Sequence, residues 1–165
     1  MIITLTGFMG SGKTTVGKVL ADFLGCPFFD LDDVIVKKAG KSIPDIFAQD
    51  GEAAFRDLEA QLLRQQVKKY AESTVVLALG GGAVLAPASA SLLHEKTVCI
   101  YLRATLDTLL ARLEGEPAGR PLADASLADR LAAREPLYEQ TAHVIIDTDG
   151  LSPDEVADEI IISSL

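Results

Sequence analysis

Apolar residues in this chain fall into short continuous runs that are separated by segments with helical spacing. Largely apolar runs occur at 2–5, 74–79 and 97–102, which is typical of strands buried on both faces. Shorter runs that begin at Phe28 and at His143 complete a set of five predicted strands. We therefore expect these strands to form the interior of a sheet.

The segments between the strands show the periodicity of amphipathic helices. Val16, Val19, Leu20, Phe23 and Leu24 recur at i, i+3, i+4, i+7 and i+8, which predicts a helix after the first strand. Further helices are predicted at 32–39, 52–70, 88–94, 106–113 and 126–138, and from 152 onward. Ser126 is the predicted N-cap of one helix, and Ser152-Pro153-Asp154-Glu155 gives the last helix a capping box with proline at its first position.

Strands that alternate with helices predict an α/β protein, with a parallel sheet flanked by helices on both faces. The chain has 165 residues, of which 48% are hydrophobic, so we expect one domain over 1–165 with a sizeable core. Residues 115–125 contain glycine and prolines but few large apolar residues, and they are predicted to form a loop. Ligands of such sheets bind beyond the carboxyl ends of the strands, so 7–14, 30–33 and 80–82 are expected to converge on one cleft.

A glycine-rich stretch directly after the first strand has the chemistry of a phosphate site. Gly7-Phe8-Met9-Gly10-Ser11-Gly12-Lys13-Thr14 fits G-x-x-x-x-G-K-[ST] at every fixed position. A strand precedes it and a helix follows, so the loop N–H groups and the helix N-terminus point at one spot, which favours phosphate. Lys13 is expected to reach the β- and γ-phosphates, and the Thr14 hydroxyl is expected to ligate Mg²⁺.

Two aspartates follow the second predicted strand. Asp30 and Asp32 lie two residues apart, so in an extended stretch both would point into the cleft. One is then suited to hold Mg²⁺ through water, and the other to orient an acceptor hydroxyl and take its proton. The alternative is a pair of caps at a helix N-terminus, where aspartate is favoured.

Three further features are candidates for the same cleft. Gly80-Gly81-Gly82 follows a buried strand, where glycines are costly unless the backbone must approach another group. Arg120 lies in the one long irregular segment and suits a cation that arrives on closure, although a solvated arginine is the usual alternative. Arg56 and Arg134 lie on predicted helices with acidic neighbours, and spacing alone gives them no role beyond a surface ion pair.

Charge and cysteine content limit the class of protein. The net charge is −9 and the isoelectric point about 4.6, which argues against a nucleic-acid surface. Cys26 and Cys99 belong to no metal-binding motif and are expected to be reduced, buried thiols of a cytoplasmic protein. The sequence enters the first strand at once, so we expect no signal peptide, and no apolar run approaches membrane-spanning length. We expect a monomer that binds small molecules.

Together the motifs resemble the shikimate kinase family, in order and over essentially the whole chain. The phosphate loop alone is shared by many nucleotide-binding proteins, whereas the combination of the other motifs is much more specific. The shared segments are 7–17, Phe29-Asp30-Leu31-Asp32, Gly40-Lys41-Ser42-Ile43, Ile46-Phe47, Gly51-Glu52-Ala53-Ala54-Phe55-Arg56, Leu79-Gly80-Gly81-Gly82-Ala83, Gly119-Arg120-Pro121-Leu122 and Arg134-Glu135-Pro136-Leu137-Tyr138.

The resemblance implies a P-loop kinase fold and ATP-dependent phosphorylation of the 3-hydroxyl of shikimate, with Mg²⁺ as cofactor. It also implies a mobile lid at about 112–124 and a substrate-binding region at about 32–60. The implied catalytic residues are Lys13, Asp32 and Arg120, and the implied metal residues are Thr14 and Asp30. ATP would contact Met9, Gly10, Ser11, Gly12, Lys13, Thr14, Thr15, Arg112 and Arg120, with Arg112 beside the adenine. Shikimate would contact Asp32, Arg56, Gly80, Gly81, Gly82 and Arg134, with the arginines on its carboxylate.

Two alternatives remain open on the sequence. One is a kinase for another small hydroxylated acid such as gluconate, which should not need both Arg56 and Arg134 with the triple glycine. The other is a catalytically silent nucleotide-binding domain. A domain without catalytic activity would be expected to lack Lys13, Asp32 or Arg120, and all three are present.

Overall fold

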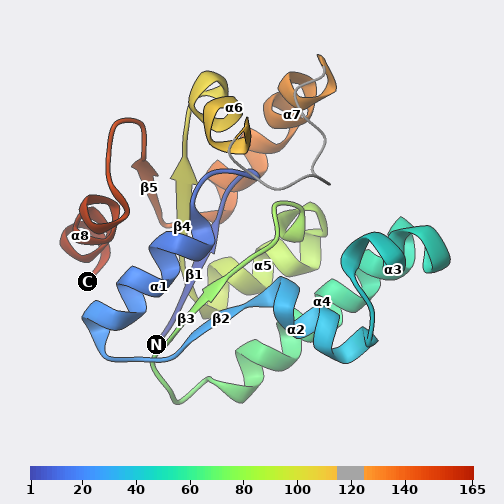
Figure 1. Cartoon of the computed structure of the whole chain (residues 1–165). Coiled ribbons are helices and arrows are strands. Elements are labelled where there is room, and N and C mark those ends of the chain that lie inside the picture. The colour runs from blue at the N-terminus through green and yellow to red at the C-terminus, as the bar shows by residue number, and fades with distance from the viewer. Residues whose placement is uncertain (115–124) are drawn as a thin grey trace.

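Five parallel strands form one sheet in the order β2-β3-β1-β4-β5 in the computed structural model, which describes residues 1–114 and 125–165 (Figure 1). The strands are β1 (Ile2–Thr6), β2 (Phe28–Asp30), β3 (Val75–Ala78), β4 (Val98–Arg103) and β5 (Val144–Asp147). All four strand pairs are parallel. The predicted α/β class and parallel sheet are confirmed.

Helices follow the strands and cover both faces of the sheet (Figure 1). They are α1 (Lys13–Leu24), α2 (Leu31–Ala39), α3 (Ile43–Asp50), α4 (Glu52–Lys69), the 3₁₀ turn η1 (Ala83–Leu85), α5 (Pro87–Lys96), α6 (Leu106–Glu114), α7 (Ala125–Thr141) and α8 (Pro153–Ser164). The predicted capping box at Ser152 is present, with both of its hydrogen bonds formed. Among the described residues, no helix is both long and apolar enough to cross a membrane.

The sheet divides the core into two hydrophobic clusters, because successive side chains of a strand point to opposite faces. In β4, Ile100 packs with α1 and α8 on one face, while Cys99 and Tyr101 pack with α4, α5 and α7 on the other. Cys99 is buried and Cys26 only half-buried, and both are free thiols. The prediction that both thiols are buried is therefore wrong for Cys26, which lies at the start of the loop before β2.

The strand register brings the three predicted functional segments to one edge of the sheet. Asp30, the last residue of β2, pairs with Ala78 of β3, and Leu5 of β1 pairs with the same Ala78. The chain leaves all three strands in the same direction, so the loops that follow them emerge side by side. The sequence-based expectation of one shared edge is confirmed.

Three local predictions need correction. The helix α3 was not predicted because it buries only Ile46, which is too short an apolar stripe to show a period. The helix α7 begins at Ala125, so Ser126 lies inside its first turn and is not its N-cap. Residues 112–114 of the predicted lid form the last turn of α6, and the rest of that lid, including Arg120, lies outside the described residues.

Candidate active site

The glycine-rich loop between β1 and α1 leaves the N-terminus of α1 open. Gly10 and Gly12 have φ angles of 82° and 94°, a left-handed region that side-chain-bearing residues rarely adopt. Gly12 is the N-cap residue of α1, and no side chain of the described residues caps this helix end. The first N–H groups of α1 thus face the cavity, where an anion can satisfy them.

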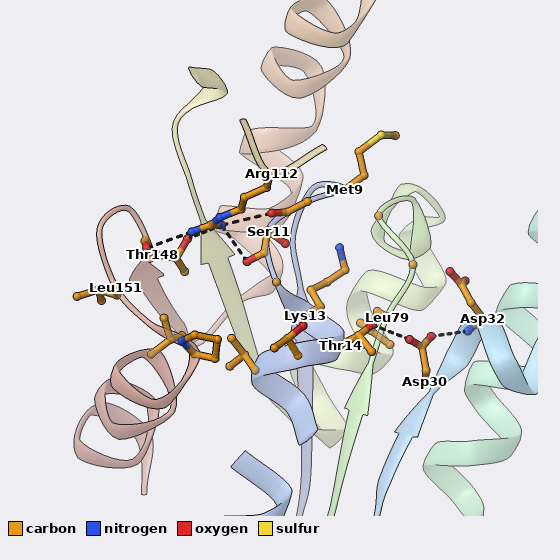
Figure 2. A pocket seen from close by; sticks show the side chains of 18 residues that line it. Met9, Ser11, Lys13, Thr14, Asp30, Asp32, Leu79, Arg112, Thr148 and Leu151 are labelled. Atoms are coloured by element: carbon orange, nitrogen blue, oxygen red, sulfur yellow. Dashed lines mark hydrogen bonds between the residues drawn. The ribbon is translucent and has the colours of Figure 1, made fainter. Parts of the chain in front are cut away.

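A cavity of about 770 Å³ opens at this helix end (Figure 2). Its wall includes every predicted ATP-binding residue that the structure describes, together with Asp30, Asp32, Gly80 and Gly81. Lys13 stands at its centre, with Nζ donating hydrogen bonds to the carbonyl oxygens of Gly7 at 2.7 Å and Phe8 at 3.0 Å. The predicted convergence of the phosphate loop, the two aspartates and the glycine segment is confirmed.

Asp30 uses both of its carboxylate oxygens in the protein. Oδ1 accepts the backbone N–H of Asp32 at 2.9 Å and caps α2, while Oδ2 accepts the Thr14 hydroxyl at 2.8 Å (Figure 2). The backbone turns from strand into helix at Leu31, so the premise that both aspartates lie in an extended stretch is wrong. Both still line the cavity, because the first turn of α2 directs Asp32 back towards it.

Arg112 ties the far wall of the cavity together. One guanidinium nitrogen, Nη1, donates to the carbonyl oxygens of Gly10 at 3.3 Å and Ser11 at 3.4 Å, and to the Thr148 hydroxyl at 3.2 Å. The other, Nη2, donates to the Thr148 carbonyl oxygen at 3.3 Å. Figure 2 shows this side chain above Ser11 of the phosphate loop, with its guanidinium directed towards Thr148. Arg112 thereby joins the loop after β1 to the loop after β5.

The triple glycine is closely approached by charged side chains. A Cβ at Gly80 would lie 3.1 Å from both Asp32 Oδ1 and Glu59 Oε2. A Cβ at Gly82 would lie 2.3 Å from Arg56 Nη1, well inside contact distance. The interpretation of this segment as a site of close approach is confirmed, and the approaching groups include Asp32 and Arg56 of the predicted substrate site.

Glu59 is the functional candidate that the sequence analysis missed. It is only 3% exposed, and its Oε1 accepts a hydrogen bond from Arg56 Nη1 at 2.9 Å. Oε2 has no hydrogen-bond partner among the described residues. Burial raises the pKa of this carboxyl, and the neighbouring Arg56 opposes that rise. Its signal in the sequence was a charge on the buried stripe of α4, four residues after Phe55, where acids are rare unless paired.

Arg134 reaches the same region from α7. Its guanidinium lies over the Phe8 ring at 5.8 Å, and a Cβ at Gly81 would lie 3.5 Å from its Nη1. Arg56 and Gly82, by contrast, line a second cavity of about 230 Å³ with Glu59. Gly80 and Gly81 line the first cavity and Gly82 lines the second, so the triple glycine borders both. The two arginines that spacing alone could not single out therefore approach the same glycine segment as Asp32.

Comparison with known proteins gives a consistent result. The model of the family described as Shikimate kinase matches residues 9–164. A shikimate kinase from Enterococcus faecalis is 44% identical over 164 residues, covering 96% of this chain and 95% of its own length. One from Limosilactobacillus fermentum is 46% identical over 165 residues, covering 98% and 94%.

Solved structures agree. Shikimate kinase from Acinetobacter baumannii in complex with shikimate has a TM-score of 0.88 and 36% identity, over 97% of this chain and 90% of that one. The enzyme from Bacteroides thetaiotaomicron has a TM-score of 0.88 and 31% identity, over 100% and 99%. A sugar kinase from Janibacter, at 20% identity and a TM-score of 0.69, shares the fold alone. The chain belongs to the shikimate kinase family.

Proposed function

We propose that this chain transfers the terminal phosphoryl group of ATP to the 3-hydroxyl of shikimate. The observation that carries the proposal is the meeting, at the triple glycine, of a phosphate loop with a carboxylate and two arginines. A substrate held there by its own carboxylate can present a hydroxyl to Asp32 beside the phosphate loop. Neither a silent nucleotide-binding domain nor a kinase for another hydroxylated acid such as gluconate should need both arginines together with the triple glycine.

Arg56 and Arg134 are assigned to the shikimate carboxylate. A guanidinium binds a carboxylate through two parallel hydrogen bonds, which fixes orientation as well as position. Glu59 Oε1 accepts a hydrogen bond from Arg56 Nη1, which fixes the position of the Arg56 guanidinium. The backbone of Gly80, Gly81 and Gly82 lies between these arginines and Asp32, so it can pack against the substrate ring.

Asp32 is assigned to the acceptor hydroxyl, whose proton it accepts as the oxygen attacks phosphorus. Lys13 lies across the cavity and supplies positive charge to the transferring group, which is the main contribution that a protein makes to phosphoryl transfer. The assignment of Arg120 to the same group rests on the family resemblance. Arg112 lies at the opposite end with Leu151 and Pro153, where an adenine ring would fit.

Thr14 and Asp30 are assigned to Mg²⁺, and the residues present fit that ion. Mg²⁺ prefers oxygen ligands and keeps several waters, so a hydroxyl and a carboxylate 2.8 Å apart beside a phosphate site suit it. No group of three or more His, Cys, Asp or Glu residues within 1–114 and 125–165 could hold a metal by itself. When bound, the ion would neutralise charge on the phosphate oxygens. Thr14 and Asp30 orient each other in its absence.

A coupled assay of ATP turnover tests the proposal directly. We expect turnover to depend on added shikimate, and to be much lower with gluconate, which is an open-chain acid without a ring, or with nucleoside monophosphates, which have no carboxylate for the two arginines. Equal turnover with gluconate would favour the kinase for another hydroxylated acid. Tight ATP binding without turnover on any acceptor would favour the silent domain. Light scattering on the same sample tests the expected monomer, and fractionation of cells tests the expected cytoplasmic location.

Gly82→Ala is expected to raise the KM for shikimate and leave the fold intact. A methyl group at Gly82 meets the flexible end of Arg56, so the guanidinium moves away instead of the backbone. Gly82 also has a φ angle of −105°, which alanine adopts without strain. The KM should approach that of Arg56→Ala, where the loss of a charge-assisted hydrogen bond costs about 1.5–3 kcal/mol. Steady-state kinetics and a melting curve of both variants check this, and an unchanged KM in Gly82→Ala would contradict it.

A further inference from the structure

Tyr138 connects α7 to the triple-glycine segment. Its side chain is fully buried, and its hydroxyl donates a hydrogen bond to the carbonyl oxygen of Gly81 at 2.5 Å. The two residues are 57 positions apart in the sequence, so the bond joins two separate elements. Gly81 lies between the phosphate loop and Arg134, since a Cβ there would be 3.5 Å from Gly7 O and 3.5 Å from Arg134 Nη1.

The ring of Tyr138 is held so that its hydroxyl has one position. It packs against the ring of Tyr101 in β4, with centroids 4.9 Å apart and planes inclined by 38°. Burial raises the pKa of Tyr138 to about 12, so the hydroxyl keeps its proton at neutral pH and remains a donor. A buried donor that is fixed by its ring and by the central sheet acts as a rigid strut.

Arg134 is also linked to this hydroxyl. It lies one helical turn before Tyr138 in α7, and its positive charge lowers the pKa of the Tyr138 hydroxyl against the effect of burial. Arginine can only donate and the Gly81 carbonyl can only accept. The Tyr138 proton is therefore directed to Gly81, and the Tyr138 oxygen lies within the field of the Arg134 charge.

We propose that Tyr138 is a positioning residue for shikimate, which sets the place of the Arg134 guanidinium relative to the glycine backbone. Arg134 holds one end of the substrate and the glycine segment packs its ring, so their separation decides how the acceptor hydroxyl meets Asp32. Tyr138 acts through both and touches neither substrate. The proposal rests on the proposed function and adds to it a residue to which no role in substrate binding was assigned.

Tyr138→Phe removes the hydroxyl and keeps the ring. We expect the KM for shikimate to rise about 3- to 20-fold, the size expected for a lost hydrogen bond beside a charged group. The KM for ATP should change less than twofold, because Lys13, Thr14 and Arg112 keep their contacts. Tyr101→Phe is the matched control: it removes a hydroxyl from the other ring of the same buried pair. Its kinetics should match those of the unaltered enzyme.

Two measurements separate positioning from a merely structural role. Hydrogen exchange of the unliganded protein should speed up over 79–83 in Tyr138→Phe and stay unchanged there in Tyr101→Phe. In a double-mutant cycle, the effects of Tyr138→Phe and Arg134→Lys on the KM for shikimate should be less than additive, because both variants disturb the same guanidinium.

The contrary results are distinct. A lower melting temperature with unchanged KM values would reduce Tyr138 to a packing residue and overturn the proposal, as would equal rises in both KM values or additive effects in the cycle. Absence of shikimate-dependent turnover in the unaltered protein would instead overturn the proposed function. The hydrogen-exchange measurement does not depend on turnover. Even if the proposed function were wrong, unchanged exchange over 79–83 in Tyr138→Phe would show that the Tyr138 hydroxyl does not fix the glycine segment.

Discussion

Asp32→Asn is expected to lower kcat by about 10²–10⁴-fold, the usual contribution of general acid–base catalysis. Asparagine keeps the shape of the side chain but cannot accept the proton of the acceptor hydroxyl. The KM for ATP should be nearly unchanged, because the nucleotide site is formed by other residues of the cavity. Steady-state kinetics with saturating shikimate checks this, and a loss below tenfold would assign Asp32 to positioning alone.

Two neighbouring variants serve as controls for Asp32→Asn. Asp33→Asn removes the same charge from the same first turn of α2, but Asp33 is exposed and does not line the cavity, so activity should be retained. Asp30→Asn should raise the Mg²⁺ requirement, and excess metal should restore part of the rate. Asparagine is as good an N-cap as aspartate, so α2 should stay folded in that variant. Rescue of Asp32→Asn by Mg²⁺, with no rescue of Asp30→Asn, would reverse the two assignments.

Lys13→Ala is expected to lose about 10²–10³-fold in kcat while the protein remains folded. Its ammonium group is a positive charge in the wall of the cavity beside the phosphate loop, and removing one preorganised electrostatic donor costs a rate factor of that order. Its bonds to Gly7 and Phe8 are to carbonyl oxygens of an already formed loop, so their loss should move the melting temperature by only a few degrees.

Lys18→Ala is the matched control for Lys13→Ala. Lys18 lies on the same helix and carries the same charge, but it is exposed and does not line the cavity. It should keep full activity and stability. If Lys13→Ala unfolded under conditions where Lys18→Ala stayed folded, Lys13 would be a structural residue. Its assignment to the transferring phosphoryl group would then be wrong.

Most of the fold could be predicted from local patterns in the sequence. Strands buried on both faces read as nearly continuous apolar runs, so β1, β3 and β4 and the parallel sheet were predictable. The phosphate loop was predictable for the same kind of reason, because its spacing of Gly10, Gly12, Lys13 and Thr14 is needed within one short segment. The helix α3 escaped because a single buried residue, Ile46, leaves no period to detect.

The acceptor side of the site was decided by the tertiary structure. Arg56, Glu59 and Arg134 lie far from the phosphate loop in the sequence. On their own helices the two arginines resemble ordinary surface charges, and Glu59 shows only its place on the buried stripe of α4. Only the packing of α4 and α7 against the triple glycine brings them within reach of Asp32. Asp30 illustrates the same limit, since its spacing predicted a cleft residue but not that it also caps α2. Sequence spacing fixes contacts within one turn or loop, whereas contacts between elements depend on how the whole core packs.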